Sequence, residues 1–206
     1  YFEPLYEECY EFALPMRKSF FTEAIGQRRD DKIFDETAVV GTQEFASRLQ
    51  SGLVPNFARW ADFIAGSEVP KEEQDAVNNQ LDEVTEYVFE VIQNSNFGQE
   101  IHESFMDLAV GTGILLVQEG NAINPVRFNA IPLPSVMLDT GPDDNIDHVY
   151  RERELKYVDI PIAYPKADLL EKVRKAVEST PEEKAKILEV VCRNYQQKNE
   201  ERYDYF

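Results

Sequence analysis

A change of hydrophobic period at about Gly113 constrains the fold more than any other feature of this sequence. Before it, apolar residues recur every three or four positions, as on one face of a helix; after it, short apolar runs alternate with turn residues, as in strands. This order predicts an α+β fold in which helices flank small antiparallel β-sheets. We expect a mainly helical part over residues 1–112 and a β-rich part with an inserted helix over residues 113–206, together forming one compact unit.

Two helices are predicted before residue 60. A short one spans residues 6–12 and ends before Pro15, which cannot continue a helix. A longer one lies in the block 35–60 and ends at the break made by Gly52 and Pro55. Its apolar stripe consists of Ala38, Phe45, Ala46, Leu49 and Leu53.

A second pair of helices is clearer. Pro70 suits the first helical position and is followed by two glutamates, which favour a helix N-terminus. Residues 94–98 break the pattern, and the next helix runs from about Gln99 to Gly111, so the two should meet at an angle. The stripe of the first helix is Val77, Leu81, Val84, Val88 and Val91, and that of the second is Ile101, Phe105 and Leu108.

Three aromatic residues at spacings of three, Phe57, Trp60 and Phe63, lie between the helices. The spacing is compatible with a short helical turn or a strand. Such rings usually pack in a core, but aromatic residues are also enriched at interface hot spots. We therefore expect these residues to be core anchors or subunit-interface anchors, and both possibilities stay open.

The β-rich part is predicted to hold four antiparallel strands, a helix and a closing β segment. A Gly-Asn turn and a Gly-Pro turn join the strands in pairs. Thr180 is expected to cap the N-terminus of a further helical turn. The strands are expected at 114–117, 126–130, 136–139 and 145–151, the helix at 164–178 and the β segment at 187–195. Because residues 202–206 resemble a strand that is cut short, we expect the chain to be a fragment of a longer polypeptide.

Composition limits the classes of function. Thirty-nine acidic against 21 basic residues give a formal net charge of −18, which disfavours a surface that grips phosphate backbones. Arg28 and Arg29 could contact phosphate or a neighbouring subunit, although two aspartates beside them favour a solvated loop. Cys9 and Cys192 form no disulfide framework, which favours a reducing compartment and two small apolar residues rather than reactive thiols. No apolar run approaches the roughly 20 residues of a membrane span, so a soluble protein is expected.

No motif for catalysis, cofactor binding or metal binding withstands inspection. His102 and Glu103 begin like a zinc-protease helix, but Met106 stands where the second histidine is needed. Gly111 and Gly113 resemble a dinucleotide loop, yet the order here is helix then strand, so a tight turn is the better interpretation. A Walker-type motif is missing, and carboxylate pairs are uninformative in so acidic a chain. We therefore predict no enzyme activity, no cofactor and no metal.

The order and spacing of these segments resemble portal proteins, the head-to-tail connectors of short-tailed, T7-like tailed phages. The opening block resembles the start of such proteins, and the later segments resemble the paired helices, hairpin and following strand of their wing region. The segments that carry the resemblance are 6–15, 35–60, 84–97, 105–117, 124–128, 131–136 and 147–153.

The resemblance implies a structural role in the virion. Portal proteins form twelve-subunit rings at one capsid vertex, where DNA is packaged and ejected without sequence-specific binding. The implied partners are other copies of the chain, the terminase motor, and capsid and tail or adaptor proteins, with no membrane. The chain would be the N-terminal wing, with stem, clip and crown segments elsewhere, and it would pass through the host cytoplasm during assembly.

Two alternatives from other classes remain. One is an acidic metal-dependent hydrolase domain, which a divalent ion would stabilise by binding only the folded state. The other is an adaptor domain that binds a protein partner, for which an exposed apolar patch on a stable monomer would be the sign.

Overall fold

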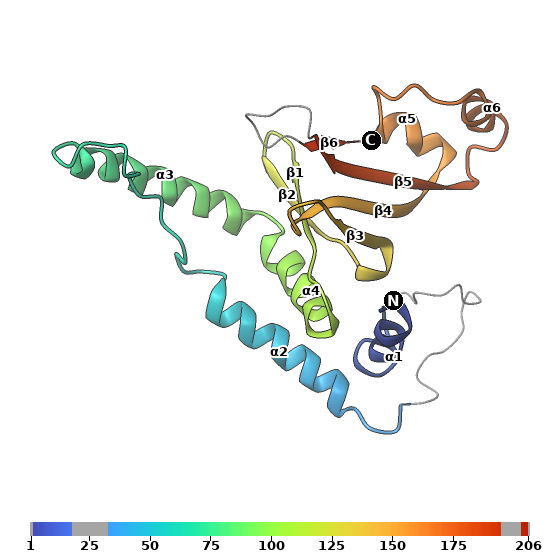
Figure 1. Ribbon diagram of the computed structural model, residues 1–206, viewed down its shortest axis with the longest axis horizontal. Helices are drawn as coiled ribbons and strands as arrows, with labels where there is room; N and C mark the ends of the chain where they lie inside the picture. Colours follow the sequence, from blue (N-terminus) through green and yellow to red (C-terminus); the bar gives the residue numbers. More distant parts are fainter. Residues whose placement is uncertain (1, 18–32, 195–202, 206) are drawn as a thin grey trace. The chain divides into compact units, whose positions relative to one another are not determined.

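Helices dominate the first of two compact units. The computed structural model describes residues 2–17, 33–194 and 203–205, and the units span Tyr1–Pro134 and Ser135–Phe206 (Figure 1). The helices of the first unit are α1 (Glu3–Ala13), α2 (Thr37–Leu53), α3 (Gln74–Asn94) and α4 (Phe97–Val110). Each corresponds to a predicted helix, so these predictions are confirmed. The segment with Arg28 and Arg29 lies outside the described residues.

Two details of the helix predictions are wrong. α3 begins at Gln74 rather than Pro70, because the Glu73 N–H donates to the Pro70 carbonyl at 2.9 Å and closes a separate turn before the helix. In α2 the predicted stripe is only partly buried: Ala46 is buried and Leu49 half-buried, but Ala38, Phe45 and Leu53 are exposed, and the buried Thr42 was not part of it. Val84 in α3 and Leu108 in α4, also stripe residues, are exposed too. Because α2 packs against both α1 and α4, its buried face lies where those helices meet it rather than along the most apolar row.

A hairpin completes the first unit and packs against α4. Its strands are β1 (Leu115–Glu119) and β2 (Val126–Ala130), which pair antiparallel as predicted. The side-chain amide of Asn96 closes the other edge of β2: its Oδ1 accepts from the Phe128 N–H at 2.9 Å, and its Nδ2 donates to the Phe128 carbonyl at 2.7 Å. Glu100 accepts from the Ala130 N–H at 2.7 Å. The break between α3 and α4, where the two helices meet at an angle as expected (Figure 1), is thereby fixed to the hairpin.

Gly111 and Gly113 make the turn from α4 into β1. A Cβ on Gly111 would lie 2.9 Å from the Tyr6 ring, and one on Gly113 would lie 2.6 Å from the Ser104 carbonyl oxygen. The prediction that these glycines allow a tight helix-to-strand turn is therefore confirmed. The core cluster beside this turn consists of Tyr10, Leu14 and Leu133, with Tyr6, Met106, Val110 and Ile114 packed against it.

The second unit is one antiparallel sheet with the strand order β3-β4-β5-β6. Two helices lie between β4 and β5 in the sequence. The elements are β3 (Val136–Thr140), β4 (Ile146–Lys156), α5 (Ile160–Ala163), α6 (Glu171–Ser179), β5 (Lys184–Arg193) and β6 (Tyr203–Tyr205). The predicted strands are confirmed, as is the α+β class. β5 begins before the predicted start at 187, and position 195 lies outside the described residues.

The helix prediction in this unit is only partly right. Residues 164–170 are not helical, because Pro165 cannot donate to the helix and disfavours helical geometry at Tyr164, which instead ends α5. Thr180 is a C-cap and not an N-cap: its N–H donates to the Ala176 carbonyl at 2.8 Å, and Pro181 then prevents continuation.

The sequence-based division at 112/113 marks where helices give way to strands, whereas the compact units divide after Pro134 because the first hairpin packs on α4. That the two units form one compact body stays a prediction. Cys9 and Cys192 are half-buried free thiols. Among the described residues, no helix is long and apolar enough to cross a membrane.

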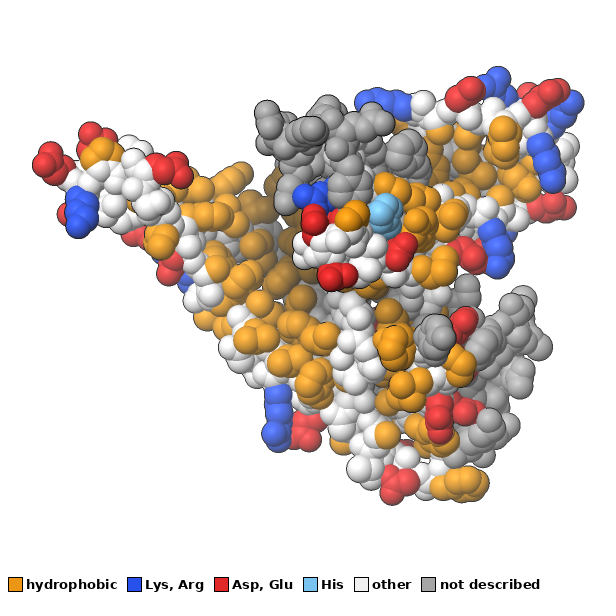
Figure 2. All heavy atoms as spheres, viewed as in Figure 1, with side chains coloured by type: hydrophobic (Ala, Val, Ile, Leu, Met, Phe, Trp, Pro, Cys, Tyr) orange, Lys and Arg blue, Asp and Glu red, His pale blue; other side chains and the backbone are white. Residues whose placement is uncertain are grey.

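Large hydrophobic side chains are more often exposed than buried in the described part of the chain (Figure 2). Twenty-four are exposed, and eight hydrophobic residues are buried. Monomeric proteins also expose apolar atoms, but a threefold excess of exposed large side chains is typical of a subunit whose surfaces are covered by other chains.

Candidate interaction surface

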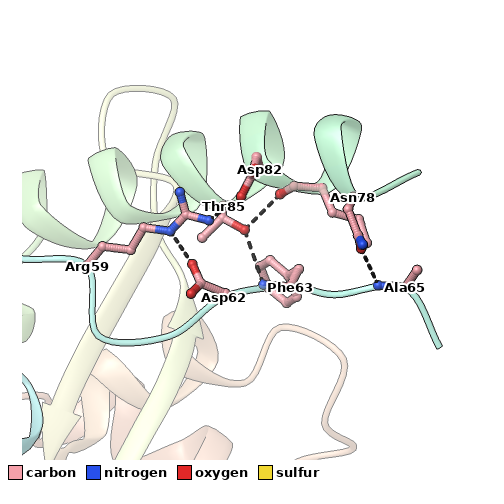
Figure 3. A network of polar contacts seen from close by, with 8 residues as sticks. Arg59, Asp62, Phe63, Ala65, Asn78, Asp82 and Thr85 are labelled. Carbon is pink, nitrogen blue, oxygen red and sulfur yellow. Dashed lines mark hydrogen bonds and ion pairs between the residues drawn. The ribbon is translucent and has the colours of Figure 1, made fainter. Parts of the chain in front are cut away.

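A segment, residues 57–65, lies along α3 in the direction opposite to the helix (Figure 3). Phe57 lies in a turn that the Ala58 N–H closes by donating to the Pro55 carbonyl at 3.3 Å, and the chain is extended from residue 59 on. The Phe63 N–H donates to Thr85 Oγ1 at 3.2 Å, and the Ala65 N–H donates to Asn78 Oδ1 at 2.8 Å. Side chains of the helix thus satisfy backbone donors of the segment, which needs no strand partner. Trp60 and Phe63 therefore lie in neither the helical turn nor the strand that the spacing allowed, whereas Phe57 lies in a turn. We call α3 and this segment the arm.

Polar contacts of Thr85 and Arg59 hold the segment against α3. Thr85 is 1% exposed, and its hydroxyl also donates to the Leu81 carbonyl at 2.7 Å, so one buried side chain serves both helix and segment. Arg59 pairs with Asp82 at 2.6 Å and with Asp62, and these contacts, led by the hydrogen bond to Asp82, raise the pKa of Arg59. Sequence reasoning missed these contacts. A polar Thr85 spaced four residues from Leu81 and Phe89 was the available signal.

The structure separates the three predicted aromatic anchors. Trp60 packs edge-on against Phe89, with ring centroids 5.2 Å apart, and stacks on Phe97 at 6.1 Å. Phe57, by contrast, is 92% exposed and Phe63 is 49% exposed. Trp60 therefore joins the segment to α3 and α4, whereas Phe57 presents its ring to solvent. That any of the three contacts another subunit stays a prediction.

A pocket of about 270 Å³ lies beside Trp60, where the arm meets α4. Its lining combines aromatic rings with amide side chains. The lining includes Trp60, Phe89, Phe97, Asn56, Asn96 and Gln99.

Exposed apolar residues continue along the arm on both the segment and the helix. Figure 2 shows hydrophobic side chains gathered over this part of the unit. We call the set the arm strip: Phe57, Phe63, Ile64, Val84 and Tyr87, all exposed. The arm is also acidic, since the segment and α3 together hold six carboxylates and one arginine. Exposed apolar side chains among polar ones are a combination found at protein–protein interfaces.

His102 has a structural role between α2 and α4. Its Nδ1 lies 3.0 Å from Gln50 Oε1, and Gln50 Nε2 donates to the Gly98 carbonyl at 2.7 Å. Within the described ranges, no three His, Cys, Asp or Glu side chains lie together as metal ligands do. The His148 ring stacks on Tyr150, with centroids 6.5 Å apart.

A buried carboxylate links α1 to α4 in the first unit. Asp107 is 1% exposed and accepts from the Tyr10 hydroxyl at 2.6 Å, while Arg17 Nε lies 3.4 Å away. Burial raises the pKa of Asp107, and the hydrogen bond from Tyr10 and the charge of Arg17 only partly offset it. Burial and the same hydrogen bond raise the pKa of Tyr10.

A second buried carboxylate links β5 to β4 and to Tyr164 in the second unit. Glu189 is 6% exposed and pairs with Arg153 at 2.9 Å and with Arg151 at 3.2 Å, and it also accepts from Tyr164. Burial alone would raise the pKa of Glu189, but hydrogen bonds from Tyr164 and Arg153 and the charge of Arg151 lower it overall. Sequence reasoning missed both carboxylates. Arg151 and Arg153, which share one face of a strand, were the available signal for Glu189.

The chain belongs to the bacteriophage head to tail connecting protein family, whose model matches residues 1–205. This is a family of structural phage proteins, so the chain connects head to tail in the virion and associates with proteins of both. A search of the curated proteins finds no match.

Proposed function

We propose that the chain is the wing part of a portal ring at one vertex of the phage capsid. Twelve copies of the complete protein would surround the conduit through which DNA is packaged and ejected, with the terminase motor as a partner during packaging and assembly in the host cytoplasm. The arm strip is the observation that carries the ring, because a subunit with so much exposed apolar surface needs neighbouring chains to cover it.

The charges of the chain support a conduit that does not hold DNA. The formal net charge is −18, and seven of the eight arginines in the described ranges are engaged in ion pairs. Arginines that already pair with carboxylates are poorly available to phosphate, and repulsion between acidic residues and DNA acts over roughly 10 Å at moderate salt. Such a surface lets a polyanion pass without binding it.

Negative-stain electron microscopy of the complete gene product tests the ring. End-on views should show rings with a central hole, whose subunits can be counted. Monomers at high concentration, with and without DNA, would contradict the proposal and would favour an adaptor that binds a single protein partner through the arm strip.

Two aromatic substitutions then test whether the strip is the covered surface. Phe57→Ser should leave the melting temperature unchanged, since the ring is exposed, and should lower the yield of rings. Trp60→Ala should lower both, because Trp60 also packs on Phe89 and Phe97. Ile123→Ser is the matched control and should assemble normally, because Ile123 lies in the hairpin loop and is 87% exposed. If Phe57→Ser assembled into rings with normal yield, the Phe57 side chain would not be part of the subunit interface.

A further inference from the structure

Acidic and basic residues are distributed unevenly between the two units. Residues 1–134 hold 23 acidic and nine basic residues, whereas residues 135–206 hold 16 and twelve. The arm holds six carboxylates and one arginine, and the exposed Glu83 and Glu86 of α3 are neighbours in sequence of the strip residues Val84 and Tyr87. Any surface that covers the strip must therefore be apolar and must tolerate or neutralise negative charge.

Two arms are poorly suited to cover each other. Placing one arm strip against another would bring carboxylates of both copies close together, and like charges across an interface are unfavourable. A symmetric two-fold contact through the strip is therefore disfavoured. A contact between the strip and a different surface of a second copy avoids this repulsion, and contacts of that kind form a ring when the rotation between copies closes.

The second unit offers a surface of the required chemistry at the start of α6. Residues 166–175 hold four basic and two acidic residues, and Leu170 among them is 74% exposed. Arg174 pairs with Asp168 and Lys175 with Glu171, both at 2.7 Å. Lys166 and Lys172 form no ion pair within the described part of the chain. We call Leu170 with Lys166 and Lys172 the α6 patch.

We propose that the arm strip of one copy docks on the α6 patch of a second copy. Leu170 would lie against the apolar side chains of the strip, and Lys166 and Lys172 would pair with exposed carboxylates of α3 such as Glu83 and Glu86. This inference rests on the proposed ring and specifies which two surfaces of the chain meet in it.

Paired charge reversals in the complete gene product test the docking. Glu83→Lys with Glu86→Lys reverses the arm, and Lys166→Glu with Lys172→Glu reverses the patch. Each pair should lower the fraction of protein in rings about tenfold or more, and combining the four substitutions should restore most of it. Glu3→Lys with Glu8→Lys on α1 changes the net charge as much as the arm reversal does and should assemble normally. Circular-dichroism melting shows whether each variant is folded.

A carbodiimide, which joins carboxylates to lysines only in direct contact, gives a second measurement on the unaltered protein. Rings assembled from a mixture of isotope-labelled and unlabelled subunits should yield links between labelled α3 peptides and unlabelled peptides containing Lys166 or Lys172. Folded reversal variants that assemble normally, or reversals that fail to recover when combined, would overturn the docking while leaving the ring intact. Cross-links found only between peptides with the same label, and so within one subunit, would also overturn the docking. Absence of rings from the unaltered protein would contradict the proposed function itself.

Discussion

Asp107 in the first unit and Glu189 in the second are both almost fully buried, yet their pKa values are shifted in opposite directions. Glu189 has two arginines and a tyrosine hydroxyl around it, and its pKa is lowered. Asp107 has a tyrosine hydroxyl and one arginine nitrogen at 3.4 Å, and its Oδ2 has no hydrogen-bond partner, so its pKa is raised. Burial is similar in the two sites, so the number of compensating partners decides whether the charged carboxylate is favoured.

The difference has a consequence for how each unit is stabilised. Removing one member of a well-compensated buried cluster leaves its partners uncompensated, whereas removing the charge of a poorly compensated carboxylate relieves part of its own desolvation cost. The second unit should therefore depend strongly on the ionised Glu189, and the first should depend on the Tyr10 hydrogen bond more than on the charge of Asp107.

Glu189→Gln is expected to have the largest effect. It leaves Arg151 and Arg153 without a buried counter-charge, which should lower the free energy of unfolding of the second unit by about 3–5 kcal/mol. Amide hydrogen exchange of β4 and β5 measures this change unit by unit. Glu152→Gln, which removes an exposed pair with Lys186, is the control and should change exchange far less. Equal effects from the two variants would contradict the importance of the buried cluster.

Tyr10→Phe should be next in size. The substitution keeps the ring in the core but leaves Asp107 without its closest donor, which should cost about 1–3 kcal/mol and increase hydrogen exchange in α1. Tyr87→Phe, on a tyrosine that is 65% exposed, is the matched control and should be nearly neutral. Unchanged protection of α1 in Tyr10→Phe would show that the hydroxyl contributes nothing to its attachment.

Asp107→Asn should be milder than Tyr10→Phe. The amide keeps an oxygen that can accept from Tyr10 while removing a charge whose burial is unfavourable, so a loss of about 1 kcal/mol or less is expected. The same chemical change at Glu189 should be several times more costly. Similar losses at Asp107 and Glu189, measured by hydrogen exchange in α4 and β5, would remove the contrast between the two sites.

Acidification should change the stability of the two units in opposite directions, and this is the smallest of the expected effects. The lowered pKa of Glu189 contributes stability that is present above the pKa of the unfolded state and is lost as the pH falls through the folded value. The raised pKa of Asp107 has the opposite sign: its ionisation costs stability, and the cost disappears as the pH falls through its folded value. As the pH falls below the ordinary glutamate pKa of 4.5, hydrogen exchange should therefore show that β5 loses protection while α4 is retained or more protected. Equal loss in both would contradict the assignment.

The sequence predicts the regular elements of this chain better than it predicts its polar contacts. Periodicity identifies the four long helices and the first strands, because each element buries one face. It fails at residues 164–170, where Pro165 overrides an apolar pattern, and at Thr180, where Pro181 decides which helix end is capped. The spacing of Phe57, Trp60 and Phe63 does not reveal an extended segment held by Thr85 and Asn78.

The buried carboxylates show why the remaining contacts are hard to predict. Tyr10 and Asp107 lie 97 positions apart in the sequence, and Arg151 and Glu189 lie 38 apart. Neither local propensity nor periodicity carries information over such distances. In a chain with 39 acidic residues, only the fold distinguishes buried carboxylates such as Asp107 and Glu189 from the solvated ones.

The contacts of Asn96 with β2 bear on whether unassembled subunits aggregate. A structural phage protein is synthesised in many copies, and any strand edge with free N–H and C=O groups can recruit a strand from a neighbouring copy and start an open-ended aggregate. At Phe128 the amide of Asn96 occupies both of these groups, and Glu100 occupies the N–H of Ala130. Along this side of the hairpin, growth by sheet extension is blocked, so subunits can accumulate in a crowded cell without polymerising through β2.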